Sequence, residues 1–357
     1  MLLFAAMLAK TGLWLIPNIG DGLRIAQDPF AQTIQEPSAQ YIMSSWLAPF
    51  IAWLLGARTE APFLLVYLGY VLGFLALVVT LAFAELEERE ARIALVVFAA
   101  LPVSASGLFW ISHDGLTFLL IVTALALRRR PALAALVGMA LGMQHFEQAF
   151  IGFAALGLAS VSTPSFGGQA PVSGRFSLAV LAGIVTGKLA LLGIFHLVGL
   201  APQGRLTWLL DRLPMLAGQF WFHAHQVVWA GLGVGWLVAL RYADRGRAAI
   251  PFFAALGGLM IVLVISEDQT RVFAAVTLPL LYAFWLSEPS FLRQLARREG
   301  AALLVVWLLV PWAWTWGGVP TWSALPYDLA LLGNRLFGWP NVPPTSALGE
   351  WPFAAGR

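Results

Sequence analysis

The sequence predicts an all-α, polytopic membrane helix bundle of about eleven transmembrane helices. Hydrophobic residues make up 60% of the 357 residues and charged residues only 11%, a composition typical of chains that lie in lipid. Apolar runs separated by short polar segments recur along the chain. Many are close to the length, about 20 helical residues, that crosses the hydrocarbon core. Arginines gather in alternate loops, as in multi-pass helical proteins.

The individual spans follow the apolar runs in chain order. We place them at 2–16, 63–85, 92–110, 115–128, 131–144, 149–162, 176–199, 217–240, 248–265, 272–287 and 301–318. The three short runs between 115 and 162 are predicted to end below the outer surface and to leave a recess there. One long helix over 131–162 is the alternative, but it would bury His145 and Glu147 at mid-membrane and invert every later loop.

Residues 1–318 are predicted to form a single transmembrane bundle, in which the first run is a retained span and not a cleaved signal. The longest outer loop, 17–62, contains an apolar stretch at about 45–56 that is too short to cross. It predicts an interfacial helix, because Trp46 and Trp53 favour the membrane surface. Residues 319–357, rich in proline and tryptophan, are expected to form an irregular extracytoplasmic tail.

Basic residues predict the orientation of the bundle. Seven arginines fall on the outer side, spread over long segments, whereas twelve of the 21 basic residues lie in loops of the other side, which is therefore expected to be cytoplasmic. These twelve are Arg89, Arg92, Arg128, Arg129, Arg130, Arg175, Arg241, Arg245, Arg247, Arg293, Arg297 and Arg298. The protein should be an integral, multi-pass component of the inner (plasma) membrane. Nucleic acid is not an expected partner, because topology accounts for the net charge of +3.

Candidate functional residues cluster on the outer side, where uncompensated ionisable groups near lipid mark sites or partners. Asp21 follows the first span between two glycines. His113 and Asp114 form a turn before one short span, and His145 and Glu147 connect two others. Turn formation, helix capping and hydrogen-bonded packing are the ordinary alternatives for these side chains.

Two further groups lie at predicted outer helix ends. Glu267, Asp268 and Arg271 precede a span, where free backbone amides and a guanidinium suit an anion such as phosphate. An acidic cap paired with Arg271 is the alternative. His223 and His225 are two residues apart, so on a helix they point in different directions and could share a metal only in a non-helical turn.

Several classes of chemistry are disfavoured by what the sequence lacks. Without cysteine there is neither a disulfide framework nor a thiolate metal site, so any metal must rest on carboxylate, imidazole or water. Phosphate-binding loops, zinc-protease motifs and nucleophile elbows do not occur, and no nucleotide or redox cofactor is expected. Carboxylates, histidines and one arginine beside a recess suit transfer from a lipid-linked phosphate donor.

In this layout the chain resembles the GT-C superfamily of integral-membrane glycosyltransferases. Asp21 takes the place of the acidic residue in that superfamily's first outer loop, which continues into the expected interfacial helix. Asp114 matches an acidic position of the second outer loop, and Arg271 follows a later one. The resemblance implies a hexosyl- or pentosyltransferase that moves a sugar from polyprenyl phosphate to a glycan, lipid or protein acceptor. No tight pair of acids follows the first span, since Asp28 lies seven residues after Asp21, so metal dependence is open.

The resemblance also implies roles for these residues. Asp21 would act as general base, and Arg271 with Asp268 would hold the donor phosphate. Four residues would orient the acceptor or hold a divalent cation, Mg²⁺ or Mn²⁺: His113, Asp114, His145 and Glu147. Additional candidates are Asp28, His223 and His225. Two other functions stay open, a secondary transporter or lipid flippase and a noncatalytic scaffold, although the chain shows no two-fold repeat of the kind common in transporters.

Overall fold

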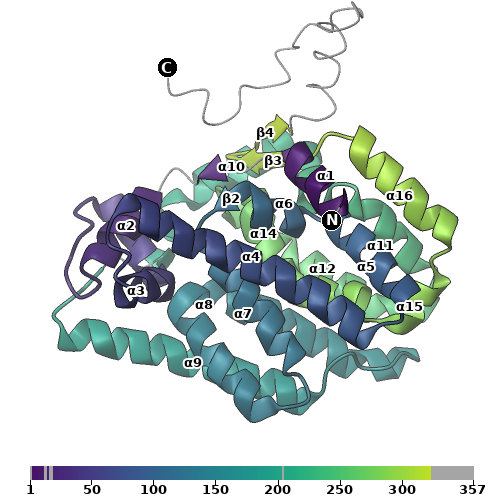
Figure 1. The fold of residues 1–357 in the computed structure, drawn as a ribbon, viewed down its shortest axis with the longest axis horizontal. Coiled ribbons are helices and arrows are strands. Elements are labelled where there is room, and N and C mark those ends of the chain that lie inside the picture. Colours follow the sequence, from purple (N-terminus) through teal and green to yellow (C-terminus); the bar gives the residue numbers. More distant parts are fainter. Residues whose placement is uncertain (1, 12–13, 16–18, 203–204, 323–357) are drawn as a thin grey trace, which may run out of the picture.

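The computed structural model describes residues 2–11, 14–15, 19–202 and 205–322, and in them the chain is predominantly α-helical (Figure 1). Within these residues four helical segments are long and apolar enough to cross a membrane: Glu60–Glu85, Pro131–Phe166, Gly174–Leu197 and Gly246–Ile265. The prediction of about eleven spans is therefore wrong. Two shorter apolar helices, Leu2–Thr11 and Asp114–Ala126, accompany the four.

The other apolar runs fail to form long helices because the backbone breaks within them. The run at 92–110 divides into α5 (Glu88–Ala100) and α6 (Pro102–Phe109), since Pro102 has no amide hydrogen with which to continue the helix. The run at 217–240 divides into α10 (Arg205–Leu232) and α11 (Gly235–Ala243). Between these two helices Gly233 has a φ of +54°, a left-handed conformation that glycine adopts without strain.

Apart from α4, which has 26 residues, the following helical elements are short. They are α1 (Leu2–Thr11), α2 (Ile19–Gln27), η1 (Pro37–Ser45), α3 (Leu47–Leu54), α4 (Glu60–Glu85), α7 (Asp114–Ala126), η2 (Thr163–Phe166), η3 (Gly246–Ala249), α12 (Ile250–Leu259), α13 (Ile261–Ile265), α14 (Gln269–Leu281), the π-helical η4 (Tyr282–Leu286), α15 (Pro289–Gln294) and α16 (Arg297–Leu309). Strands β1 (Trp14–Leu15) and β2 (Trp110–Ile111) pair in parallel, and β3 (Ala313–Trp316) and β4 (Val319–Trp322) form an antiparallel hairpin.

Helix α8 (Pro131–Ser162) leaves helical geometry at His145, where φ is −145° and ψ is 74°. Its first leg packs against α9 (Gly174–Leu197) through glycines. Gly138 lies against the carbonyl of Val180, and Gly142 against that of Ile184, so this leg runs parallel to α9.

The second leg of α8 runs the other way along the same helix. Glu147, just after the bend, is 3.8 Å from Lys188 of α9, and Gly157, ten residues later, lies against Ser177. Because the later residue meets the earlier part of α9, the chain turns back at His145, as the separate short runs 131–144 and 149–162 predict. Beyond Lys188, α9 continues for about 13 Å at 1.5 Å per residue. The bend thus lies below the end of α9.

The first outer loop covers the space above this bend. Ile42, Met43 and Trp46 are buried in one cluster with Leu191 and Phe195 near the end of α9. The expected helix at 45–56 is present as α3 (Leu47–Leu54). Trp46 was expected at the membrane surface but is buried in the protein, where its Nε1 donates a hydrogen bond to the carbonyl of Pro29 at 2.8 Å. The recess is therefore capped by protein.

Two of the arginines expected on the cytoplasmic side pair with acids where α4 ends and α5 begins. Arg128 holds Glu85 with two hydrogen bonds of 3.1 and 2.9 Å, and Arg293 donates to Glu90 at 2.8 Å. Helices α5, α11, α15 and α16 lie together on the right of Figure 1. Beyond Trp322, the expected tail at 319–357 falls outside the described residues.

Candidate functional site

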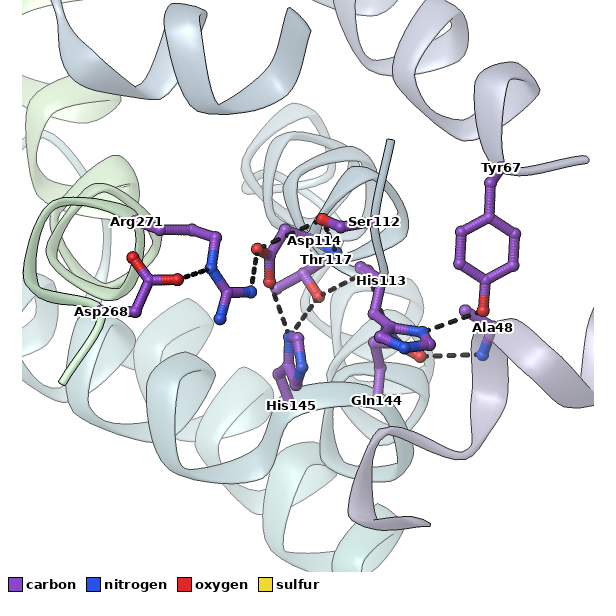
Figure 2. A network of polar contacts seen from close by, with 10 residues as sticks. All are labelled: Ala48, Tyr67, Ser112, His113, Asp114, Thr117, Gln144, His145, Asp268 and Arg271. Carbon is purple, nitrogen blue, oxygen red and sulfur yellow. Dashed lines mark hydrogen bonds and ion pairs between the residues drawn. The ribbon is translucent and has the colours of Figure 1, made fainter. Parts of the chain in front are cut away.

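A buried polar network joins three segments that are far apart in the sequence (Figure 2). Asp114 begins α7, and its Oδ2 accepts a hydrogen bond from Nη1 of Arg271, in the first turn of α14, at 2.6 Å. The other carboxylate oxygen, Oδ1, is 3.4 Å from Nδ1 of His145 at the bend of α8. The Asp114 side chain is 1% exposed, so this ion pair is shielded from solvent.

Arg271 also pairs through Nε with Asp268, which in turn accepts a hydrogen bond from Nε1 of Trp314 at 2.9 Å. Burial raises the pKa of the Asp268 carboxyl, and the neighbouring Arg271 opposes this increase. The guanidinium thus contacts a carboxylate through each of two nitrogens. Its third nitrogen, Nη2, makes no hydrogen bond to any residue in the described part of the chain.

Hydrogen bonds from neighbouring elements position the two histidines. Thr117 Oγ1 lies 2.8 Å from Nδ1 of His145. The hydroxyl of Tyr67 is 2.9 Å from Nδ1 of His113, and Gln144 donates to the His113 carbonyl at 2.9 Å. Figure 2 shows these side chains facing one another across α4, α7 and α8.

A cavity of about 300 Å³ opens beside this network. Its polar lining includes Arg271, Asp268, Glu267, His145 and Glu147. Apolar side chains line the same cavity, among them Leu206, Trp208, Leu209, Val262 and Ile265. Gln148 also lines the cavity and is 8% exposed, and its Oε1 accepts no hydrogen bond from the described residues. A ligand with an anionic group at Arg271 and an apolar part fits this mixed lining.

Asp21 does not line this cavity. Its carboxylate pairs with Arg24 at 2.5 Å on α2, and burial raises its pKa while Arg24 opposes the increase. The adjacent Gly22 packs directly against the imidazole of His113, so Asp21 lies near the network but shares no hydrogen bond or ion pair with it.

The three additional candidates also lie away from the cavity. Asp28 is exposed and accepts a hydrogen bond from the amide of Phe30 at 3.1 Å, which is ordinary turn chemistry. His223 lies at a bend of α10, with φ of −122° and ψ of 18°. His225 is exposed, and neither histidine lines the cavity.

Sequence reasoning missed several residues that shape the site. Thr117 follows His113 by four residues and so lies on the same face of its helix, a spacing that could have indicated a shared environment. Gln148 is in the short polar segment that also supplies His145. Trp314 and Trp208 gave no local signal, because a tryptophan near a membrane surface is ordinarily an interface anchor.

The carboxylates and imidazoles of this site do not fit a divalent cation. Among the described residues, no three His, Asp or Glu side chains converge as a metal-binding group. Asp114 and Asp268 both pair with Arg271, whose positive charge would repel a cation. We therefore assign no step of the reaction at this site to a metal ion.

Comparison with known proteins gives no match: neither a family model, nor a curated protein, nor a solved structure corresponds to this chain.

Proposed function

We propose that this chain is a glycosyltransferase of the plasma membrane that moves a sugar from a polyprenyl-phosphate donor to an acceptor at the extracytoplasmic face. The observation that carries the proposal is the setting of Arg271. Its guanidinium is fixed by Asp114 and Asp268 and has a nitrogen without a hydrogen bond to the described residues, beside a cavity that apolar side chains also line. Such a lining suits a phosphate attached to a lipid.

In the proposed reaction an acceptor hydroxyl oxygen attacks the anomeric carbon of the donor sugar. The bond from that carbon to the phosphate oxygen breaks, and polyprenyl phosphate leaves with the bonding electrons. Nη2 of Arg271 stabilises the charge that develops on the phosphate. A carboxylate accepts the hydroxyl proton. Two residues compete for this role: Asp21, which the resemblance implies, and Glu147, which lines the cavity.

Donor binding is the first test. Purified protein would be incubated with polyprenyl phosphate in nanodiscs, and bound lipid measured by native mass spectrometry. Arg271→Gln should lose binding at least about tenfold, the equivalent of about 1.4 kcal/mol. Arg128→Gln is the matched control, since Arg128 also pairs with an acid but lies on the opposite face. Equal retention by both variants would contradict the role of Arg271.

Turnover separates the two candidate bases. Membranes would be supplied with polyprenyl-phosphate sugars, and the release of polyprenyl phosphate followed in Asp21→Asn and Glu147→Gln. The base variant should keep donor binding and lose turnover by a factor of roughly 100 or more. If both variants release polyprenyl phosphate as fast as the unchanged chain, neither carboxylate is the base.

A carrier of anionic lipid is the second candidate, because a broken helix lines the cavity. The bend at His145 of α8 is of the kind found at transporter sites. A carrier would bind polyprenyl phosphate through Arg271 and move it between leaflets without releasing sugar. Scrambling of a labelled polyprenyl phosphate in proteoliposomes distinguishes this function from transfer.

A further inference from the structure

A second cavity, of about 570 Å³, lies between α5 and α16. Its residues change in character along both helices. The first turns supply Glu88, Arg89, Arg92 and Arg297, and the following turns supply Ile93, Val96, Gly300, Ala301 and Leu304. One end of the cavity is thus cationic and the other apolar. The cationic end belongs to the face expected to be cytoplasmic, opposite the candidate active site.

The charged end carries an excess of positive charge. Three arginines and one glutamate give the cavity lining a net charge of +2. Arg92 pairs with Glu88, and Arg89 donates to the carbonyl of Leu295 at 2.6 Å. Arg297 is exposed and makes no ion pair or hydrogen bond with the described residues. The amino ends of α5 and α16 both lie here, and their dipoles add to the positive potential.

The apolar end continues into exposed apolar surface. Val305 and Leu309, farther along α16, have exposed fractions of 52% and 64%. A soluble anion would use the arginines and leave the apolar end in contact with water, whereas a phospholipid satisfies both ends. Basic pockets between helices at the cytoplasmic membrane surface are suited to anionic lipid headgroups.

We propose that this cavity binds an anionic phospholipid, with its headgroup phosphate at Arg297 and Arg92 and an acyl chain along Ile93, Val96 and Leu304. The proposal is independent of the glycosyltransferase function, because it uses other residues at the other end of the molecule.

Binding would be measured by native mass spectrometry of the full chain with phosphatidylglycerol, and with phosphatidylcholine as the zwitterionic comparison. Phosphatidylglycerol should bind at least about tenfold more tightly. Arg297→Gln should abolish most of this preference. Arg298→Gln is the matched control, since Arg298 is the exposed neighbour that does not line the cavity. Equal effects of the two substitutions, or equal binding of the two lipids, would overturn the proposal.

Gly300→Leu tests the cavity itself without removing charge. A Cβ at Gly300 would meet only Cγ1 of Ile93, at 3.8 Å, so a larger side chain can enter the cavity without disturbing the backbone. Leucine is also a better helix former than glycine. Loss of phosphatidylglycerol binding in this variant supports a site within the cavity, and unchanged binding overturns the proposal in favour of a diffuse basic surface. Displacement of phosphatidylglycerol by millimolar glycerol 3-phosphate would also overturn the proposal, because it would show that the cavity binds soluble anions.

Discussion

Arg271 is the residue on which the buried network depends, because it is the cation shared by two carboxylates. Removing one partner of a buried ion pair leaves an uncompensated charge, at a typical cost of about 3–5 kcal/mol. We expect Arg271→Gln to lower the free energy of unfolding by an amount in this range, measured by thermal or denaturant unfolding in detergent. Arg128→Gln breaks a more exposed pair and should cost about 1 kcal/mol or less.

Adding Asp114→Asn to Arg271→Gln removes one of the two buried negative charges, so the double variant should recover part of the lost stability. A double variant no more stable than Arg271→Gln alone would show that burial of Asp114 is not the source of the cost.

Asp268 makes donor binding depend on pH. Its pKa is raised by burial, so its charge is lost at a higher pH than that of an ordinary carboxyl. Once neutral, it no longer competes for Arg271. We therefore expect a polyprenyl phosphodiester, whose own charge is constant, to bind more tightly as the pH falls through the raised pKa. Asp268→Asn should bind tightly throughout and flatten the profile; an unchanged profile would contradict this explanation.

The sequence was sufficient to predict that Asp114 and Arg271 meet, although 157 residues separate them, because both lie at outer ends of apolar helices. The place of Asp21 could not be derived in the same way. Its glycine neighbours indicate a flexible turn, but the residue lies on a regular helix, where Arg24 is one turn away and satisfies its charge. Local composition does not reveal such a partner when the backbone conformation is misjudged.

Among the helices, the close contact of α8 with α9 depends on glycines spaced four apart on both. Gly138 and Gly142 face the backbone of α9, and Gly183 and Gly187 face that of α8. This spacing of small residues lets two helix backbones approach closely in a membrane. The contact fixes the bend that presents His145 to the cavity, so packing at the helix interface determines the geometry of the candidate site.

Gly187→Ala should disrupt this interface, because a Cβ there would overlap the carbonyl of Met139. We expect a loss of about 1–3 kcal/mol, the usual cost of overpacking, in unfolding experiments in detergent. Gly193→Ala is the matched control on the same helix, since nothing lies within 4 Å of its Cβ position. That variant should be neutral or slightly stabilised. Equal stabilities of the two variants would show that the backbones do not touch.

Helix lengths show what hydrophobicity alone cannot predict. The runs that became α4 and α9 were placed within about three residues, because nothing interrupts them. The run at 301–318 is equally apolar, yet α16 ends at Leu309 and the remainder forms the β3–β4 hairpin. There Trp314 and Thr315 bond to Asp268 and Thr270, respectively. These tertiary hydrogen bonds override the helical preference and are invisible in a hydropathy pattern.

For the molecule as a whole, the two clusters of charge predict its orientation in the membrane. The chain contains no cysteine, so a single introduced cysteine is the only thiol. Gln35→Cys, in the exposed part of the first outer loop, should react with a membrane-impermeant maleimide on intact cells. Arg129→Cys, in an exposed turn on the arginine-rich face, should react only after permeabilisation. The reverse pattern would invert the orientation proposed here.

The reversal of α8 at His145 bears on how the chain is made. Because both ends of the hairpin lie on the same side, no polar loop between Pro131 and Ser162 has to be translocated. The hairpin can leave the translocon sideways as a single insertion unit. The imidazole of His145, at the tip of the hairpin, then enters the membrane together with the two legs. The candidate site would then be complete only after α9 is synthesised, because the first leg of α8 packs against glycines of α9 that include Gly187.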